Sequence, residues 1–217
     1  MMGRMTQKTS VQHAYDEIRH WVVTGEFEAG TKMIVRPIAE RLGISATPIK
    51  SALAALERDG FLVAIPNRGY FVPHVDIDDV REIYELREAL DGLAVRKAAA
   101  RPDAPDFAQR VLIPIYEQQE RSVAHQDIGW LRDLDIEFHQ AIWRAADNER
   151  LAKFTDSLSG QIRLAWGTHR PGLFERALVE HRHILDAIAA GDPAKAEEAS
   201  REHLRRALAA YGPLVSG

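Results

Sequence analysis

Hydrophobic residues recur every three to four positions over the first sixty residues, a spacing that predicts helices. We expect a first helix over 9–24, a short second helix over 35–42 and, after a turn at 43–45, a third helix that runs to about 59. Ser45 stands where the third helix begins and is of a residue type that caps helices. The first sixty residues are therefore predicted to form three helices.

Two β-prone runs follow these helices. They cover residues 61–65 and 70–72, and the sequence Pro-Asn-Arg-Gly at 66–69 separates them. Such a turn between two apolar runs predicts a β-hairpin. Three helices followed by a hairpin are typical of a winged helix-turn-helix.

After a linker at 73–76, the pattern shows no further strand signal, and prolines and glycines mark the ends of helices. The six helices expected are 77–100, 104–124, 127–146, 148–169, 172–190 and 193–211. Pro114 lies inside the second of them and is expected to kink it. The chain is thus predicted to be mainly α, with a winged helix-turn-helix domain over 1–75 and an antiparallel six-helix bundle over 76–217.

The charge differs between these two parts. Residues 1–75 hold nine Lys and Arg against seven Asp and Glu, a net charge of +2, and residues 76–217 hold nineteen against twenty-five, a net charge of −6. A basic head on an acidic body suits a DNA-binding domain joined to a regulatory one.

Composition restricts the kinds of metal site and the cellular compartments that are possible. The chain has no cysteine, which excludes disulfides and thiolate metal sites. It shows neither an apolar leader nor a run of about 18 apolar residues. We therefore expect a cytoplasmic protein that is associated with the nucleoid and not with a membrane.

The second helix of a helix-turn-helix enters the major groove with its first residues. The polar positions expected there are Ser45, Thr47, Lys50 and Ser51. Lys50 can reach a phosphate or a guanine edge, and Thr47 a phosphate or a thymine methyl group. Arg68 and Gly69 at the hairpin tip can approach the DNA backbone or the minor groove. The alternative is a helix pair with a solvated basic face and no DNA partner.

Four residues of metal-ligand type fall on apolar faces of the predicted bundle. Asp135 and His139 lie one turn apart within one apolar stripe, and the four-residue spacing stacks their side chains. His181 and His203 lie on the apolar faces of the last two helices, whereas His183 faces outward. One aspartate and three neutral histidines suit Zn, Ni, Mn or Fe. The alternatives are hydrogen-bonded core histidines and a buried Asp135–His139 hydrogen bond.

The N-terminal part resembles the DNA-binding domain of the GntR family of bacterial regulators over residues 11–73. The runs that carry the resemblance are GEFEAGTKM, RPIAERLGISATPIKSALAALERDGFLV and PNRGYFV. It implies DNA contacts by Arg36, Lys50 and the turn Arg68-Gly69. The family usually has Arg where Ala46 and Lys50 stand, so a different operator sequence is expected.

The remainder resembles the FCD-type effector domain of the FadR branch of that family, over residues 78–210. The runs that carry this resemblance are DIEFHQAI, EHRHILDAI and HLRRAL. The resemblance implies a divalent metal held by Asp135, His139, His181 and His203, with a small carboxylate metabolite bound beside it. Six helices rather than seven resemble the VanR-type subgroup.

Arg87 is the candidate to hold that carboxylate, because it lies between apolar positions of the first bundle helix and its guanidinium can enter the bundle. The alternatives for Arg87 are an ion pair with Asp91 and a dimer contact. Arg163 shares a face with Trp166 and is a second effector-binding candidate, with a surface or dimer role as its alternative.

Together these features predict a DNA-binding transcriptional regulator, in the commoner case a repressor. A homodimer is expected to bind a pseudo-palindromic double-stranded operator and to respond to a small carboxylate at the metal. One alternative is a helical metal-dependent enzyme, although no additional positioned acid or base is identifiable. The other is a regulator whose metal is purely structural.

Overall fold

The computed structural model describes residues 9–125, 128–165 and 172–211. The chain divides into two compact units between Val75 and Asp76, except that the segment Gly160–Gly167 groups with the first unit. The roles given to 1–75 and 76–217 stay predictions. None of the helices within the described ranges is long and apolar enough to cross a membrane.

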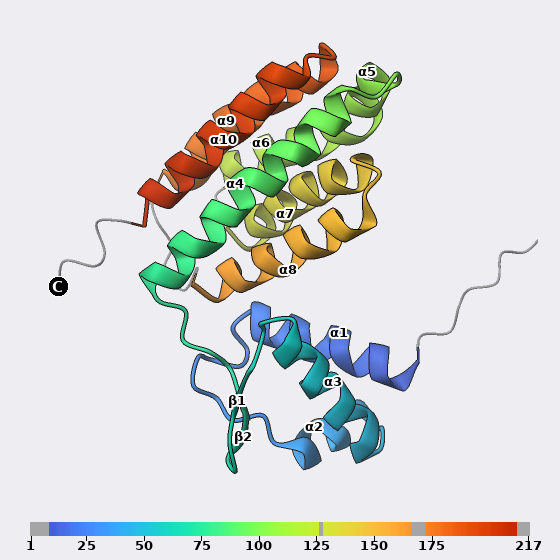
Figure 1. The fold of residues 1–217 in the computed structure, drawn as a ribbon, viewed down its shortest axis with the longest axis vertical. Helices are drawn as coiled ribbons and strands as arrows, with labels where there is room; N and C mark the ends of the chain where they lie inside the picture. The colour runs from blue at the N-terminus through green and yellow to red at the C-terminus, as the bar shows by residue number, and fades with distance from the viewer. Residues whose placement is uncertain (1–8, 126–127, 166–171, 212–217) are drawn as a thin grey trace, which may run out of the picture. The chain divides into compact units, whose positions relative to one another are not determined.

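The first unit contains three helices and a β-hairpin (Figure 1). Its elements are α1 Ser10–Val23, α2 Val35–Leu42, α3 Ala46–Arg58, β1 Val63–Ile65 and β2 Gly69–Phe71. The Thr9 hydroxyl caps α1 by accepting a hydrogen bond from the N–H of Gln12 at 3.2 Å. Ser45 is the N-cap residue of α3, but its side chain makes no capping hydrogen bond. The predicted winged helix-turn-helix is confirmed.

The hairpin is shorter than predicted at its start. β1 and β2 pair antiparallel, with Val63 opposite Phe71. Phe61 and Leu62 belong to the predicted first strand, but both are buried in the core of the unit and precede the pairing. The turn needs left-handed backbone at Gly69, where φ is 102°, a conformation that glycine adopts without a steric cost.

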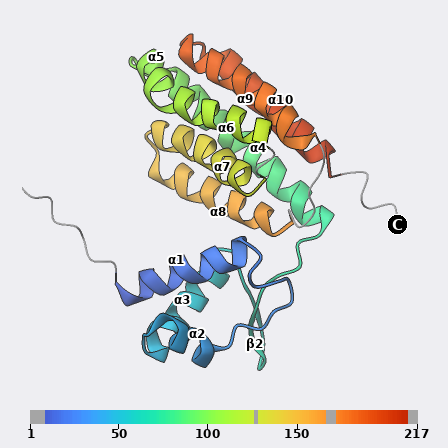
Figure 2. The ribbon, with the colours of Figure 1, turned by 180° about the vertical axis from the view of Figure 1, so that it is seen from behind.

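The second unit is all helical (Figures 1 and 2). Its elements are α4 Ile77–Ala99, α5 Ala104–Phe107, the π-turn η1 Ala108–Leu112, α6 Ile113–His125, α7 Ile128–Ala145, α8 Glu149–Ala165, α9 Leu173–Ala189 and α10 Pro193–Ala209. α10 packs against α4 and α9, and α7 packs against α4 and α6. With α5, η1 and α6 continuous, the antiparallel six-helix bundle is confirmed. The predicted helix ends at 127 and at 166–169 lie outside the described residues.

The segment around Pro114 departs from regular α-helix where a kink is expected. The five residues before Ile113 form a π-turn, in which the N–H of Ile113 bonds to the carbonyl of Ala108. Proline lacks an N–H and its ring clashes with the carbonyl four residues earlier, so a local widening of the helix accommodates it. The chain thus continues as α6 without a break.

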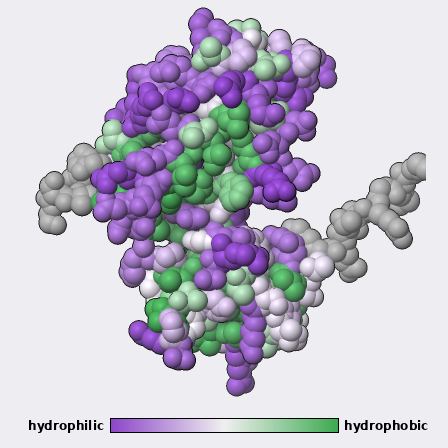
Figure 3. Space-filling view, viewed as in Figure 1, coloured by the Kyte–Doolittle hydropathy of each residue, from purple (hydrophilic) through white to green (hydrophobic). Residues whose placement is uncertain are grey.

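The core of the second unit is formed by apolar faces of α4, α6, α7, α9 and α10. Its largest fully buried side chains include Trp143, Phe138, Leu112, Ile142 and Leu185. Several large apolar side chains are also exposed, among them Leu86 on α4, Trp130 on α7 and Phe154 on α8. Figure 3 shows hydrophobic surface on this unit, over the region in which Figure 1 draws α4 and α7.

Candidate metal centre and DNA-binding face

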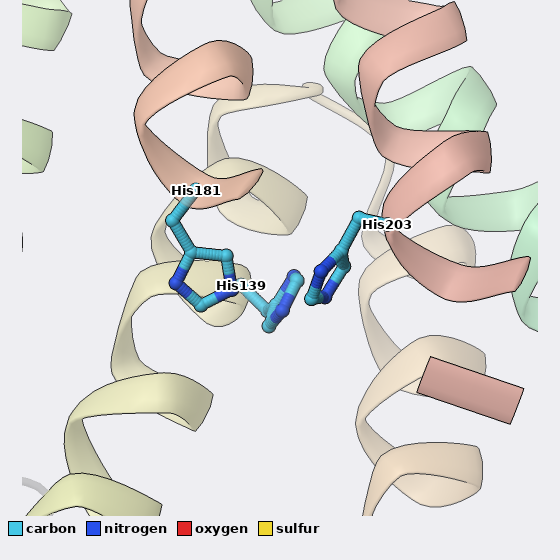
Figure 4. Close-up of side chains that lie close together, drawn as sticks. All are labelled: His139, His181 and His203. Carbon is cyan, nitrogen blue, oxygen red and sulfur yellow. The ribbon is translucent and has the colours of Figure 1, made fainter. Parts of the chain in front are cut away.

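Three histidine side chains meet inside the second unit (Figure 4). His139 comes from α7, His181 from α9 and His203 from α10, and all three are buried. One ring nitrogen of each lies within 4.8 Å of those of the other two. The predicted inward direction of these side chains agrees with the structure, and His183 is exposed, as its position two residues after His181 requires.

Hydrogen bonds orient two of the rings. Nδ1 of His181 lies 3.1 Å from Oε1 of Gln119, whose amide in turn donates to the carbonyl of Leu134 at 3.0 Å. Because that oxygen only accepts, Nδ1 of His181 carries the proton and Nε2 keeps its lone pair. Nδ1 of His203 donates in the same way to the Glu180 carboxylate at 2.8 Å. Such outer hydrogen bonds are typical of metal-ligating histidines.

The electrostatic surroundings keep His139 and His181 neutral. Burial lowers the pKa of His139 well below its usual 6.5, and His181, His203 and Arg87 lower it further. Burial also lowers the pKa of His181, with added repulsion from His203 and Arg87. Neutral imidazole is the form that binds a metal ion. The lone pairs are therefore available at neutral pH.

The surroundings of Nε2 of His181 show whether the three histidines fit a metal ion. This atom is buried and has no hydrogen-bond partner within the described part of the chain. A buried polar atom without a partner is costly, and a metal ion would supply that partner. Three buried histidines, one of them with an unpartnered ring nitrogen, fit a divalent ion of the zinc type.

Asp135, the fourth predicted ligand, lies at the edge of this cluster. Its side chain is 17% exposed, and its Oδ1 is 3.6 Å from Nε2 of His181. Its carboxylate is not among the ligand atoms that all lie within 4.8 Å of one another. The structure thus brings three predicted ligands together and places the fourth beside one of them.

Glu180 and Gln119 contact the histidine cluster, and the pattern of the sequence does not reveal them. Glu180 precedes His181 in the chain but holds His203 on another helix, and it also pairs with Arg206 at 3.4 Å. Its burial is the consequence of packing between α9 and α10. Helical periodicity describes one helix at a time, so it gives no signal for such a contact.

Arg87 is buried on α4 and forms the ion pair that was one of its predicted alternatives. Its Nε and Nη2 donate to Oδ2 of Asp91 at 3.2 and 2.9 Å, and Nε1–H of Trp143 donates to Oδ1 of Asp91 at 2.8 Å. Burial favours the neutral form of Arg87, but Asp91, Tyr84 and Asp135 together outweigh it and raise the pKa of Arg87. The guanidinium stays charged close to the histidines, where it contributes to the lowered pKa of His139.

A pocket of about 200 Å³, part of it open solvent, lies beside Asp135 and His181. Its other lining residues are Gln119, Val123, Leu131, Phe174, Ala177 and Leu178, from α6, α7 and α9. The lining is mainly apolar, and its polar residues are Gln119, Asp135 and His181. Neither Arg87 nor Arg163 is among these residues. Arg87 is paired with Asp91, and Arg163 lies half-buried on α8 in the segment that groups with the first unit. Trp166 lies outside the described residues.

The first unit presents the predicted DNA-binding residues at its surface. Ser45, Thr47, Lys50 and Ser51 are all exposed at the start of α3, whereas Ile49 beside them is buried. The first N–H groups of α3 and its dipole favour a phosphate at the same place.

Two further predicted contact sites lie on α2 and on the hairpin. Arg36 is exposed and pairs with Glu40 one turn later at 2.9 Å. Arg68 and Gly69 are exposed at the hairpin tip. A recognition helix with exposed polar residues at its start, joined to a separate helical domain, defines the class of DNA-binding transcriptional regulators.

Comparison with known proteins agrees with that class and gives the family. Residues 10–72 match the bacterial regulatory proteins of the gntR family, and residues 82–206 match the FCD domain. The chain therefore belongs to the gntR family of regulators, and its second unit carries an FCD domain.

Two relatives that are named as regulators match most of the chain. The Nta operon transcriptional regulator of Aminobacter aminovorans is 31% identical over 77% of this chain and 78% of its own length. A probable D-xylose utilization operon transcriptional repressor of Paenarthrobacter nicotinovorans is 28% identical over 98% of this chain and 92% of its own length. These relatives are transcriptional regulators, which decides against the enzymatic alternative.

The fold also agrees with a solved structure. E. coli McbR/YncC superposes with a TM-score of 0.77 at 21% identity, covering 94% of this chain and 97% of that one. At this level of identity the likeness supports the fold, a winged helix joined to a helical domain.

Proposed function

We propose that the chain is a transcriptional repressor whose affinity for its operator is controlled by a small carboxylate bound at a divalent metal. DNA binding by the first unit follows from its family, and the metal and the effector are the proposed parts. The name of the Paenarthrobacter nicotinovorans relative, a probable repressor, supports repression as the direction of control.

The observation that supports a metal site is the buried histidine cluster, in which one ring nitrogen has no hydrogen-bond partner within the described residues. Nε2 of His181 lacks a partner within the described residues, while Nδ1 of His181 and of His203 are oriented by Gln119 and Glu180. His139, His181 and His203 would hold the metal, with Asp135 beside them as the fourth ligand. A bound Zn²⁺, Ni²⁺, Mn²⁺ or Fe²⁺ supplies open coordination positions that attract a carboxylate.

The surroundings of the cluster support an anionic effector. The positive charge of Arg87 disfavours protonation of His139 and His181. The same field attracts an anion, although Asp91 neutralises part of it. A small pocket, partly open to solvent, lies beside Asp135 and would have to widen to admit the remainder of such a ligand. Arg87 remains the candidate that contacts the carboxylate, and Arg163 remains a weaker one because it lies in the other unit's segment.

A homodimer is the expected assembly. Two winged helices related by a two-fold axis match a pseudo-palindromic operator whose two half-sites lie about one helical turn apart. Exposed Leu86, Trp130 and Phe154 on the second unit provide apolar surface for a partner copy. An operator-binding protein acts where the DNA is, which supports the proposed location in the cytoplasm with the nucleoid.

A regulator with a purely structural metal is the second candidate, and the Arg87–Asp91 pair favours it. Both charges are buried and satisfied by each other and by Trp143. In this alternative the metal stabilises the bundle and no effector is needed to explain the site.

One experiment separates the two. The full chain would select DNA from a random-sequence library, and its affinity for the selected duplex would be measured with and without chelator and with a panel of small carboxylates. The proposal expects at least one carboxylate to raise the melting temperature of the metal-loaded chain and to release the duplex, and to do neither after chelation. Metal-dependent stability with no response to any carboxylate would instead support the structural metal.

A further inference from the structure

The hairpin of the first unit has a third backbone segment beside it. The N–H of Gly30 donates to the carbonyl of Val72 at 2.9 Å, and the N–H of Val72 donates to the carbonyl of Thr31 at 3.0 Å. The N–H of Met33 donates to the carbonyl of Tyr70 at 2.9 Å. These bonds bracket the residue between Thr31 and Met33, so its backbone is held alongside β2.

That residue is Lys32, and it forms an antiparallel bridge with Phe71. Residues directly opposite each other in an antiparallel pair carry their side chains on the same face. Tyr70 and Val72 pack in the core of the unit, so Phe71 between them faces away from that core, and Lys32 with it. Lys32 therefore lies on the outer face of the hairpin.

Two cations share the ring of Phe71. Nζ of Lys32 is 5.9 Å from the ring centroid, and Cζ of Arg68 is 5.6 Å from the same centroid. Cε of Lys32 also lies 3.8 Å from the place that a Cβ on Gly69 would occupy. The lysine stem thus extends along the outer face to the hairpin tip, beside Arg68.

Neither cation is neutralised. Within the ranges that the structure describes, Lys32, Arg68 and Lys50 have no carboxylate partner, whereas Arg36 pairs with Glu40. Exposed cations held in place by backbone pairing and by an aromatic ring, but without a counter-charge, suit binding to phosphate.

We propose that Lys32 is a further DNA-contacting residue, which binds a backbone phosphate next to the contact made by Arg68. Phe71 serves as the platform that holds both side chains at the tip. The inference rests on DNA binding by the first unit and adds to it a contact that lies outside the helix-turn-helix and outside the hairpin turn.

The test measures how salt affects DNA binding by the full chain. The probe is a mixed-sequence duplex of about 30 base pairs, on which binding depends mainly on phosphate contacts. Lys32→Met keeps the apolar stem over Phe71 and removes the charge. Each lost phosphate contact should reduce the slope of log affinity against log salt by about 0.9 in magnitude, whereas Lys32→Arg should keep the slope. Lys153→Met, at an exposed lysine of the second unit, is the matched control.

A second readout does not depend on any substitution. Acetylation of lysines in the wild-type chain, followed by mass spectrometry, should be slowed by the duplex at Lys32 and unchanged at Lys153. Full reactivity of Lys32 in the DNA complex, or an unchanged salt slope in Lys32→Met while Arg68→Met reduces it, would overturn the inference alone. If Arg68→Met and Lys50→Ala also leave binding unchanged, the DNA-binding face assigned to the first unit is wrong as a whole.

Discussion

The carboxylate of Glu180 on α9 accepts a hydrogen bond from Nδ1 of His203 on α10 at 2.8 Å. This bond fixes which nitrogen of His203 carries the proton and raises the basicity of the other one. In the proposed metal site, a residue outside the ligand set would thereby affect how tightly the cluster binds its ion.

Glu180→Gln should weaken metal binding by about 10- to 100-fold, because the amide removes the charge that favours a proton on Nδ1. Competition with a chromogenic chelator measures the affinity. Glu117→Gln, at an exposed glutamate of α6, is the control and should bind as the wild type does. Equal affinities of the two variants would remove Glu180 from the site.

His139→Ala should leave less than one metal ion per chain after dialysis, since the cluster loses one of its three histidine ligands. Elemental analysis of the purified protein gives the stoichiometry. His183→Ala is a matched control, because His183 is exposed on α9 and lies outside the cluster. Full stoichiometric metal in His139→Ala would contradict the ligand set.

Asp91→Ala should destabilise the second unit by about 3–5 kcal/mol, because it leaves the buried Arg87 charge without its partner. It also removes the acceptor of the Trp143 indole. Urea unfolding of the metal-loaded chain measures the loss. The double variant Arg87→Met with Asp91→Leu should recover most of it, since it removes both buried charges. A loss of less than about 1 kcal/mol in Asp91→Ala would mean that the pair is not buried in solution.

The chelated protein should lose stability as the pH falls below the usual histidine pKa of 6.5. Folding lowers the pKa of His139 and His181, mainly through burial, so the unfolded chain binds more protons than the folded one in that range. Stability is then fully present above pH 6.5 and decreases on acidification. Melting temperatures in EDTA from pH 8 to about pH 5 would show this decline.

The double variant His139→Gln with His181→Gln is the comparison for that pH series. It removes both titrating groups, so its melting temperature should fall less steeply over the same range. Parallel curves for the two proteins would assign the pH dependence to other residues.

Sequence periodicity is sufficient to predict those features that depend on a single helix. His139, His181 and His203 each lie on an apolar face, and a helical bundle brings such faces together. The hairpin and the start of α3 follow from equally local signals. The architecture of both units could therefore be predicted without the structure.

Features that depend on packing between elements could not be predicted. The contacts of Glu180 with His203 and of Trp143 with Asp91 join different helices, and no spacing in the sequence encodes them. The pairing of Lys32 with Phe71 joins residues far apart in the chain. Asp135 shares a stripe with His139, yet its distance from the other ligands depends on how α7 lies against α9 and α10.

The second unit begins at Asp76, which is the N-cap residue of helix α4. Asp76 and Asp79 form a capping box that fixes its first turn, and Arg87 lies eleven residues further on, about 16 Å along the helix axis. An uninterrupted helix is stiff over that length. A small tilt of α4 at Arg87 would therefore displace its first turn. The residues that join this turn to the first unit would move with it.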